Sequence, residues 1–317
     1  MPGWDVWRKA SGLAALVVVL VPALAAGQLA RDLGLIPADT DAPLVALLPT
    51  ETSFALEQLR YERVEQARVA TRHNIKLLFH ERGIPYPAAE IFLRVFKRER
   101  SLELWVRGQD RDRFELLKIY DICAMAGALG PKRKQGDNQT PEGFYHISFF
   151  NPRSEYHLSL HVNYPNARDR AAGLAGISLG GDIYIHGGCS SEGCLAITDE
   201  GIRELYWLSV EARSGGQQRI PVHIFPARLE TRDLQILQQT FGEEPELGRF
   251  WATLKPAYDY FEEHRQLPGV VVNGRGEYAL VGSADDVVAE QESAAPAVRV
   301  PAGPRPLGSP VGGGSPH

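Results

Sequence analysis

The feature that most constrains this chain is an apolar segment, residues 183–185, that leads directly into a glycine-rich loop. The loop carries a histidine at its start, His186, and two cysteines, Cys189 and Cys194. A cysteine attacks as a thiolate, and a histidine on a neighbouring rigid strand can accept its proton, so such a pair supplies a nucleophile and a base. We therefore predict that Cys194 is a nucleophile and that His186 is its base.

The glycines of this loop, at positions 187, 188 and 193, allow the backbone to turn tightly. They also bring backbone N–H groups near the thiol, where those of Gly193 and Cys194 can hold the oxyanion of an attacked amide. The residues leave one alternative open, a Cys189–Cys194 disulfide in a non-catalytic protein. Cys123 lies in an apolar stretch and is expected to be a core residue. Because Cys194 is the predicted nucleophile, replacing Cys189 by alanine is expected to leave the activity nearly unchanged.

The loop resembles the signature of the L,D-transpeptidases, the YkuD-like cysteine enzymes of the bacterial cell wall, which read His-Gly, a loop, then Ser-x-Gly-Cys. The matching residues are His186-Gly187 and Ser191-Glu192-Gly193-Cys194. The resemblance covers residues 112–226. Within this range, four segments resemble the YafK-like branch of the family: 129–132, 139–145, 150–154 and 163–166. It implies an α+β, mainly β fold, with a β-sandwich or barrel catalytic domain and added N- and C-terminal helices. It implies no cofactor.

Two features depart from the wider family pattern. Only seven residues separate His186 from Cys194, and Ala196 stands where the family usually has an arginine, two residues after the cysteine. Another residue must therefore bind an acidic substrate. Because a guanidinium binds a carboxylate bidentately, Arg153 and Arg168 are candidates, and the sequence does not decide between them.

The resemblance implies an enzyme that acts on diaminopimelate amide bonds of peptidoglycan stem peptides. The short loop and Ala196 favour water as the acceptor, and hence a hydrolase (amidase) that releases a peptidoglycan-linked outer-membrane lipoprotein. The alternative is a true L,D-transpeptidase that forms 3–3 cross-links or attaches the lipoprotein. An alternative of another class is a non-catalytic wall-binding module with a Cys189–Cys194 disulfide.

The N-terminus carries an export pattern. Arg8 and Lys9 precede an apolar run over 12–26, which contains the small residues Ala23 and Ala25. This pattern is typical of a cleaved signal peptide, with an uncleaved inner-membrane anchor as the alternative, and it predicts a periplasmic location. The net charge of -5 gives no positive field that would favour a nucleic-acid partner.

Two histidine pairs are candidates for metal ligands. His157 and His161 are four residues apart in an alternating segment and are expected to face the same side, while His73 and His80 lie in a helical pattern. Neither pair has a carboxylate or a cysteine at a convincing ligand spacing. The sequence therefore predicts no metal site.

Apolar periodicity indicates helices over 54–82, 200–212, 228–241 and 246–264. Alternation over 91–97, 102–107 and 114–122 predicts an antiparallel meander, continued by strands at 145–150, 156–162, 183–185 and 220–225. The predicted organisation is a signal peptide (1–25), a linker (26–53), an N-terminal helix (54–85), an L,D-transpeptidase-like catalytic domain (86–230), C-terminal helices (231–282) and a disordered tail (283–317).

Overall fold

The computed structural model describes residues 52–283. The predicted signal peptide (1–25), nearly all of the linker (26–53) and nearly all of the predicted tail (283–317) lie outside the described residues. None of the helices between residues 52 and 283 combines the length and hydropathy that a membrane-spanning segment requires.

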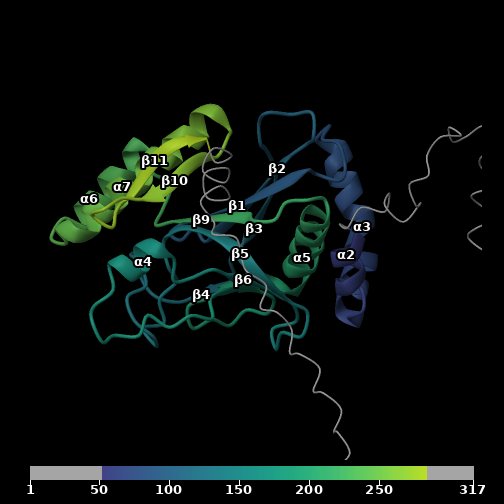
Figure 1. Cartoon of the computed structure of the whole chain (residues 1–317), viewed down its shortest axis with the longest axis horizontal. Helices are drawn as coiled ribbons and strands as arrows, with labels where there is room; N and C mark the ends of the chain where they lie inside the picture. The colour runs from purple at the N-terminus through teal and green to yellow at the C-terminus, as the bar shows by residue number, and fades with distance from the viewer. Residues whose placement is uncertain (1–51, 284–317) are drawn as a thin grey trace, which may run out of the picture. The chain divides into compact units, whose positions relative to one another are not determined.

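A mixed β-sheet of nine strands forms the centre of the described region (Figure 1). Its strands, in chain order, are β1 (Glu90–Phe96), β2 (Ser101–Arg107), β3 (Glu115–Asp121), β4 (Ala124–Met125), β5 (Gly143–Asn151), β6 (Ser159–Val162), β7 (Tyr184–His186), β8 (Leu195–Ala196) and β9 (Ile220–Phe225). Their order in the sheet is β3-β2-β1-β9-β5-β6-β7-β8-β4. With the helices around it, this sheet confirms the predicted α+β fold.

Two of the strand pairs are parallel, which corrects the prediction of an antiparallel sheet. β1 pairs with β9 in parallel, and β7 pairs with β8 in parallel. Parallel neighbours need a connection that returns to the same end of the sheet. The loop 187–194, between β7 and β8, makes that return, so its course is dictated by the pairing of the strands that flank it.

The N-terminal helical pattern folds as two helices, α2 (Thr52–Gln58) and α3 (Glu62–Glu81), where the sequence predicted one. Tyr61, between them, has extended dihedral angles (φ -93°, ψ 120°), which interrupt the helical hydrogen-bond ladder. On α3 the buried side chains recur every three or four residues, as an amphipathic helix requires: Val64, Ala67, Thr71, Ile75 and Phe79.

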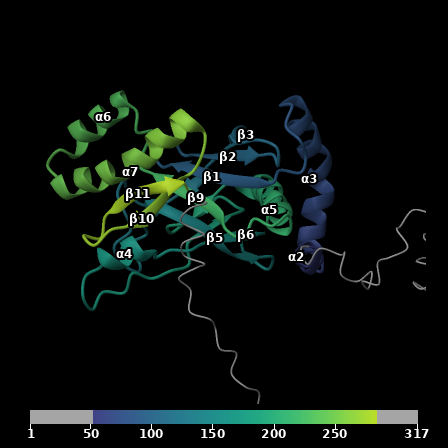
Figure 2. The ribbon, with the colours of Figure 1, turned by 45° about the horizontal axis from the view of Figure 1, so that its top comes forward.

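Helix α5 (Thr198–Ser214) lies between the sheet and the N-terminal helices. Figures 1 and 2 both show α3 on the outer side of α5, and α5 contacts α2, α3 and several strands. Its side chains Ile202, Leu205 and Leu208 are buried in the large apolar cluster that also contains the sheet. This helix begins soon after Cys194, so the main core anchors the chain directly behind the predicted nucleophile.

The C-terminal region ends in a strand pair that the sequence prediction missed. After α4 (Ala167–Ala171), which precedes β7, the later elements are α6 (Thr231–Phe241), α7 (Pro245–His264), β10 (Pro268–Val272) and β11 (Tyr278–Ser283). β10 and β11 form an antiparallel hairpin that contacts α7, in part of the segment predicted to be helical. Its turn contains Asn273-Gly274, a dipeptide typical of hairpin turns, so a signal was present in the sequence.

Candidate active site

His186 is held by the register of the sheet. It is the last residue of β7 and pairs with Ser159 of β6 on one side and with Ala196 of β8 on the other. Its side chain is 2% exposed, and the ring of Tyr156 lies 4.6 Å away in a tilted arrangement.

The tautomer of His186 follows from its neighbour. Nδ1 lies 2.6 Å from the carbonyl oxygen of Gly187, which can only accept, so Nδ1 carries the proton and Nε2 is the acceptor. Burial lowers the pKa of His186 below its ordinary value, although the hydrogen bond to Gly187 opposes this. The ring is therefore neutral at neutral pH and can act as a base through Nε2.

Cys194 is the last residue of the loop and immediately precedes the neighbouring strand, β8. Ile185 pairs with Leu195 in the β7–β8 ladder, which places Cys194 beside Tyr184. Side chains in register across a parallel pair share a face, so Ala196 shares the face of His186. Cys194 precedes β8, and its thiol contacts the backbone of Tyr184 and Asp182. The structure therefore places the predicted nucleophile beside β7, the strand that ends at the predicted base, His186.

The thiol of Cys194 is free and partly exposed. Its Sγ accepts a hydrogen bond from Tyr184 N at 3.4 Å and donates one to the carbonyl oxygen of Asp182 at 3.4 Å. Burial raises the pKa of Cys194, Asp182 adds to this, and the Tyr184 N–H and Lys132 oppose it. Cys194 is therefore a thiol at neutral pH. To act as the predicted nucleophile it would have to turn from Asp182 toward His186, as apo geometries often require.

The cysteine pairing differs from both expectations. Cys123 and Cys189 form a disulfide, with Cα atoms 5.4 Å apart, so the alternative Cys189–Cys194 disulfide is wrong and Cys123 is not a free core residue. The reason is topological. Cys123 immediately precedes β4, and its N–H donates to the carbonyl oxygen of Ala196, so β4 lies beside β8 and beneath the returning loop. A partner 66 positions away is thereby brought to Cys189.

The base end of the loop 187–194 is tied to helix α5. Gly188 N donates to Asp199 Oδ1 at 2.8 Å. A Cβ atom on Gly187 would lie 2.5 Å from the same oxygen and 2.9 Å from the carbonyl oxygen of Tyr156, so only glycine fits there. The Gly that follows His186 therefore permits a close approach of the loop to α5.

The nucleophile end of the loop is closed by Ser191. Its hydroxyl donates to the carbonyl oxygen of Cys194 at 2.8 Å and accepts from Gly193 N at 3.1 Å. The N–H of Gly193, one of the two predicted oxyanion donors, is therefore engaged in this structure. The N–H of Cys194 is left as the better candidate for that role.

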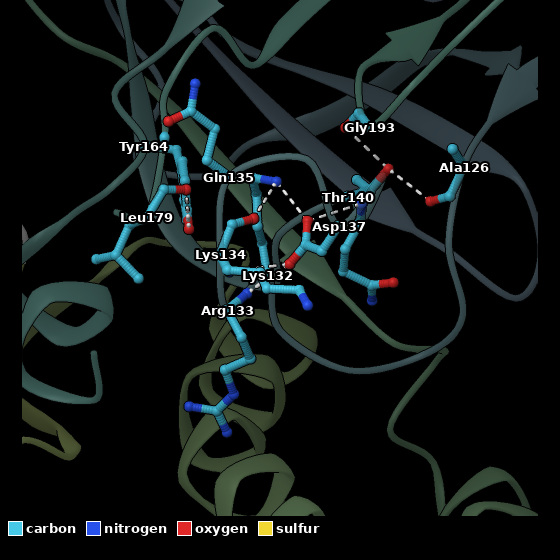
Figure 3. A network of polar contacts seen from close by, with 12 residues as sticks. Ala126, Lys132, Arg133, Lys134, Gln135, Asp137, Thr140, Tyr164, Leu179 and Gly193 are labelled. Atoms are coloured by element: carbon cyan, nitrogen blue, oxygen red, sulfur yellow. Dashed lines mark hydrogen bonds and ion pairs between the residues drawn. The ribbon is translucent and has the colours of Figure 1, made fainter. Parts of the chain in front are cut away.

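Sequence reasoning missed the contribution of Thr140, which it treated as part of a turn. Thr140 is fully buried, and its Oγ1 donates to the carbonyl oxygen of Gly193 at 3.0 Å (Figure 3). The sequence carried one signal for this residue, since residues 139–145 belong to the segments that resemble the family. Nothing local to 139–145 indicated contact with residue 193.

The two candidate carboxylate-binding arginines lie in different surroundings. The Arg153 guanidinium lies 5.1 Å above the ring of Tyr61, and that of Arg168 lies 4.1 Å above the ring of Phe250 in α7. Burial lowers the pKa of Arg168, and the nearby charge of Arg133 lowers it further.

Arg133 belongs to a polar loop organised around Asp137. The carboxylate of Asp137 accepts hydrogen bonds from the side chain of Lys132 and from the backbone N–H groups of Arg133 and Lys134 (Figure 3). The guanidinium of Arg133 points away from this network, and Arg133 lines a cavity of about 500 Å³ that also touches Gln139 and the start of α7.

The two histidines considered as metal ligands do not form a pair. His157 has a positive φ of 69° and its Nε2 accepts from Arg203 at 2.9 Å, whereas His161 lies in β6 and hydrogen-bonds with Ser148 at 2.6 Å. Among residues 52–283, no three histidine, cysteine or carboxylate side chains gather as a metal site would require.

The candidate site lies within the part of the chain that matches known proteins. A family model described as the L,D-transpeptidase catalytic domain (YkuD) matches residues 91–222, which include both His186 and Cys194. The chain is 40% identical, over 188 residues, to proteins named "Putative L,D-transpeptidase YafK" from Escherichia coli strain K12 and E. coli O157:H7. The match spans 58% of this chain and 72% of each relative.

Among solved structures, similarity is found to the helical cell shape determining protein Pgp2 of Campylobacter jejuni, with a TM-score of 0.34, 17% identity and coverage of 58% of this chain and 73% of that one. Bd1075 of Bdellovibrio bacteriovorus gives a TM-score of 0.31, 20% identity and coverage of 57% and 63%. On the family model and the E. coli relatives, the chain belongs to the L,D-transpeptidase family.

Proposed function

We propose that the protein is an exported cysteine enzyme that cleaves diaminopimelate amide bonds in peptidoglycan, with Cys194 as nucleophile and His186 as base. One observation carries the proposal. Inside the matched catalytic domain, the free thiol of Cys194 contacts the backbone of Tyr184 in β7, and the same strand ends at the buried His186 with its unprotonated Nε2. Peptidoglycan as substrate follows from the family.

The chemistry proceeds in two halves. Nε2 of His186 takes the thiol proton as Sγ attacks the amide carbonyl, and the backbone N–H of Cys194 stabilises the oxyanion. The C–N bond then breaks, the leaving amine takes the proton from His186, and an acyl enzyme remains. His186 next deprotonates the acceptor, which attacks the thioester and releases the thiol.

We favour water as the acceptor, and hence an amidase that releases a peptidoglycan-linked lipoprotein. The loop 187–194 is short and is held to the body of the domain by Asp199 and by the Cys123–Cys189 disulfide, so it offers little to enclose an amine acceptor. Position 196 is a fully buried alanine and contributes no charge to hold one. A true L,D-transpeptidase is the second candidate, because both reactions share the acyl enzyme.

We propose that Arg168, rather than Arg153, binds the substrate carboxylate. The charge of Arg133 lowers the pKa of Arg168, and Arg133 lines the cavity beside Gln139. Two guanidinium groups near one another favour an anion between them. Arg153 instead lies against Tyr61, which precedes α3.

A periplasmic location is part of the same proposal. The N-terminal export pattern predicts it, and the Cys123–Cys189 disulfide supports it, because disulfides persist mainly in oxidising compartments.

The test is to incubate the protein with sacculi that carry covalently bound lipoprotein and, separately, with disaccharide tetrapeptides, and to analyse the products by mass spectrometry. We expect released lipoprotein and little or no 3–3 linked dimer, with neither product from Cys194→Ala. Dimers that accumulate in a Cys194-dependent way, with the lipoprotein still bound, would favour the transpeptidase instead.

A further inference from the structure

Thr140 makes a hydrogen bond to the backbone that precedes the nucleophile. A hydroxyl has one hydrogen, and two carbonyl oxygens lie within reach of Thr140 Oγ1, that of Gly193 at 3.0 Å and that of Ala126 at 3.3 Å (Figure 3). The shorter contact, to Gly193, is the better acceptor. Thr140 is fully buried, so water does not compete for this bond.

The position of this bond gives it a consequence for Cys194. The carbonyl oxygen of Gly193 and the N–H of Cys194 belong to one planar trans peptide, in which the two groups point in opposite directions. A hydrogen bond that fixes the carbonyl oxygen therefore also fixes the direction of the Cys194 N–H. Gly193 has φ +134°, a region that glycine adopts freely, so its own backbone preferences do not set the orientation of this peptide.

The backbone of Thr140 is itself held in place by a buried lysine, Lys97. The Nζ of Lys97 donates to the carbonyl oxygens of Thr140 and Gly130, at 2.9 Å each, and forms an ion pair with Glu142 at 2.9 Å. The side chains of Lys97 and Glu142 are completely buried.

Glu142 connects the same network to the C-terminal helices. One of its oxygens accepts from Gly130 N at 2.6 Å, and the other accepts from Trp251 Nε1 at 2.8 Å. A buried ion pair whose remaining hydrogen-bonding groups are satisfied forms a stiff support. The hydroxyl of Thr140 therefore projects from a fixed base.

We propose that Thr140 is a positioning residue for acyl transfer, whose hydroxyl holds the Gly193–Cys194 peptide so that the Cys194 N–H is directed at the oxyanion. This role rests on the proposed function only in that Cys194 is the acylated nucleophile. The Thr140 hydroxyl contacts backbone carbonyl oxygens and not the thiol. It acts on a peptide that stabilises charge only while a carbonyl is under attack.

Two reactions of the same thiol separate this role from a merely structural one. Acylation of Cys194 by p-nitrophenyl acetate passes through an oxyanion, since Sγ attacks the carbonyl, p-nitrophenolate leaves and His186 takes the thiol proton. Alkylation by iodoacetamide displaces iodide directly and forms no oxyanion. The ratio of the two rate constants therefore reports oxyanion stabilisation, and Cys123 and Cys189 do not interfere because they are joined in a disulfide.

We expect Thr140→Val to lower the ratio of the acylation rate constant to the alkylation rate constant about tenfold. This is less than the roughly 10²–10³-fold effect of losing an oxyanion donor, because the Cys194 N–H is still present and only its orientation is released. Thr140→Ser, which keeps the hydroxyl, is expected to retain the wild-type ratio. The matched control is Thr71→Val, since Thr71 is also buried and donates to a backbone carbonyl, that of Ala67, but lies on α3. Its ratio should not change.

Thr140→Ala provides a second variant without the hydroxyl, so either variant that folds, as judged by circular dichroism, decides the matter. An unchanged ratio in these variants, which includes equal losses in both rate constants, would overturn the role of Thr140. A tenfold fall of the ratio in Thr140→Ser would do the same. A wild-type protein that is alkylated but never acylated would instead overturn the proposed function, and this role with it.

Discussion

His186 ends a strand and Cys194 ends the loop that follows it, and they are held in place by different means. His186 ends β7 and is flanked by β6 and β8, so the sheet register sets the position of its backbone. Cys194 ends a loop that has no regular structure and is held by contacts at separate points. These contacts come from Cys123, Thr140 and Asp199, residues scattered over three other parts of the chain.

The difference shows how a reactive group can be positioned outside regular secondary structure. A strand residue inherits its position from ladder hydrogen bonds that the whole sheet maintains. A loop residue needs dedicated contacts, and each of these can be removed without dismantling the sheet. The nucleophile should therefore be more sensitive than the base to changes at distant positions.

The largest effect on the site is expected from removing the proposed nucleophile itself. Cys194→Ala should lower the rate of lipoprotein release by at least about 10³-fold, because no other free thiol lies in the described region and a covalent intermediate cannot form. The measurement is lipoprotein release from sacculi, with circular dichroism to confirm that the sheet persists. Release that continued in this variant would exclude Cys194 as the nucleophile.

Removing the Cys123–Cys189 disulfide tests how the loop 187–194 is held, without changing the strand that carries His186. Removing a bridge between residues 66 apart is expected to lower the free energy of unfolding by about 4 kcal/mol on the chain-entropy account. The sequence-based expectation that Cys189→Ala is nearly neutral concerned activity and took no account of this bridge. Cys123→Ala/Cys189→Ala is the cleaner variant, since it leaves no unpaired Cys123 thiol.

Urea unfolding of this double variant gives the stability change, and Cys194 acylation in the folded protein gives the effect on the site. We expect acylation to fall while the β6–β7–β8 ladder that holds His186 persists. A free energy of unfolding within about 1 kcal/mol of wild type would show that the bridge does not constrain the loop.

The smallest expected effect is on the pH dependence of the reactions, which compares the protonation of Cys194 with that of His186. Burial raises the pKa of Cys194 and lowers that of His186. Since His186 must be neutral to act as a base, the acylation rate should hold as the pH falls through about 6.5, the ordinary histidine value, and decline only below it. Alkylation of the thiol should continue to rise above about pH 8.5, the value for an ordinary cysteine.

Rates of p-nitrophenyl acetate acylation and iodoacetamide alkylation across the pH range check both signs. A resting thiolate–imidazolium pair would behave in the opposite way, with alkylation already at its plateau in neutral solution. That outcome would mean that the pKa directions of the two groups are reversed.

What the sequence could predict follows the same division. The family signature led to the proposal of His186 and Cys194, and periodicity located α5 and most strands of the described region, because these signals are local. The Cys123–Cys189 pairing depends on β4 lying beside β8, and no local pattern carries that information. Thr140 was missed for the same reason. The break between α2 and α3 was missed because the residues there are compatible with a helix.

The burial of Ala196 has an evolutionary consequence. Its side chain is 0% exposed, and its carbonyl oxygen accepts the N–H of Cys123, so the surrounding chain has closed around a methyl group. An arginine restored at this position, the usual residue of the family, would have to bury a long charged side chain where the neighbours leave it no room. The alanine is therefore difficult to reverse by a single substitution, because the arginine would lower the free energy of unfolding unless neighbouring side chains changed with it.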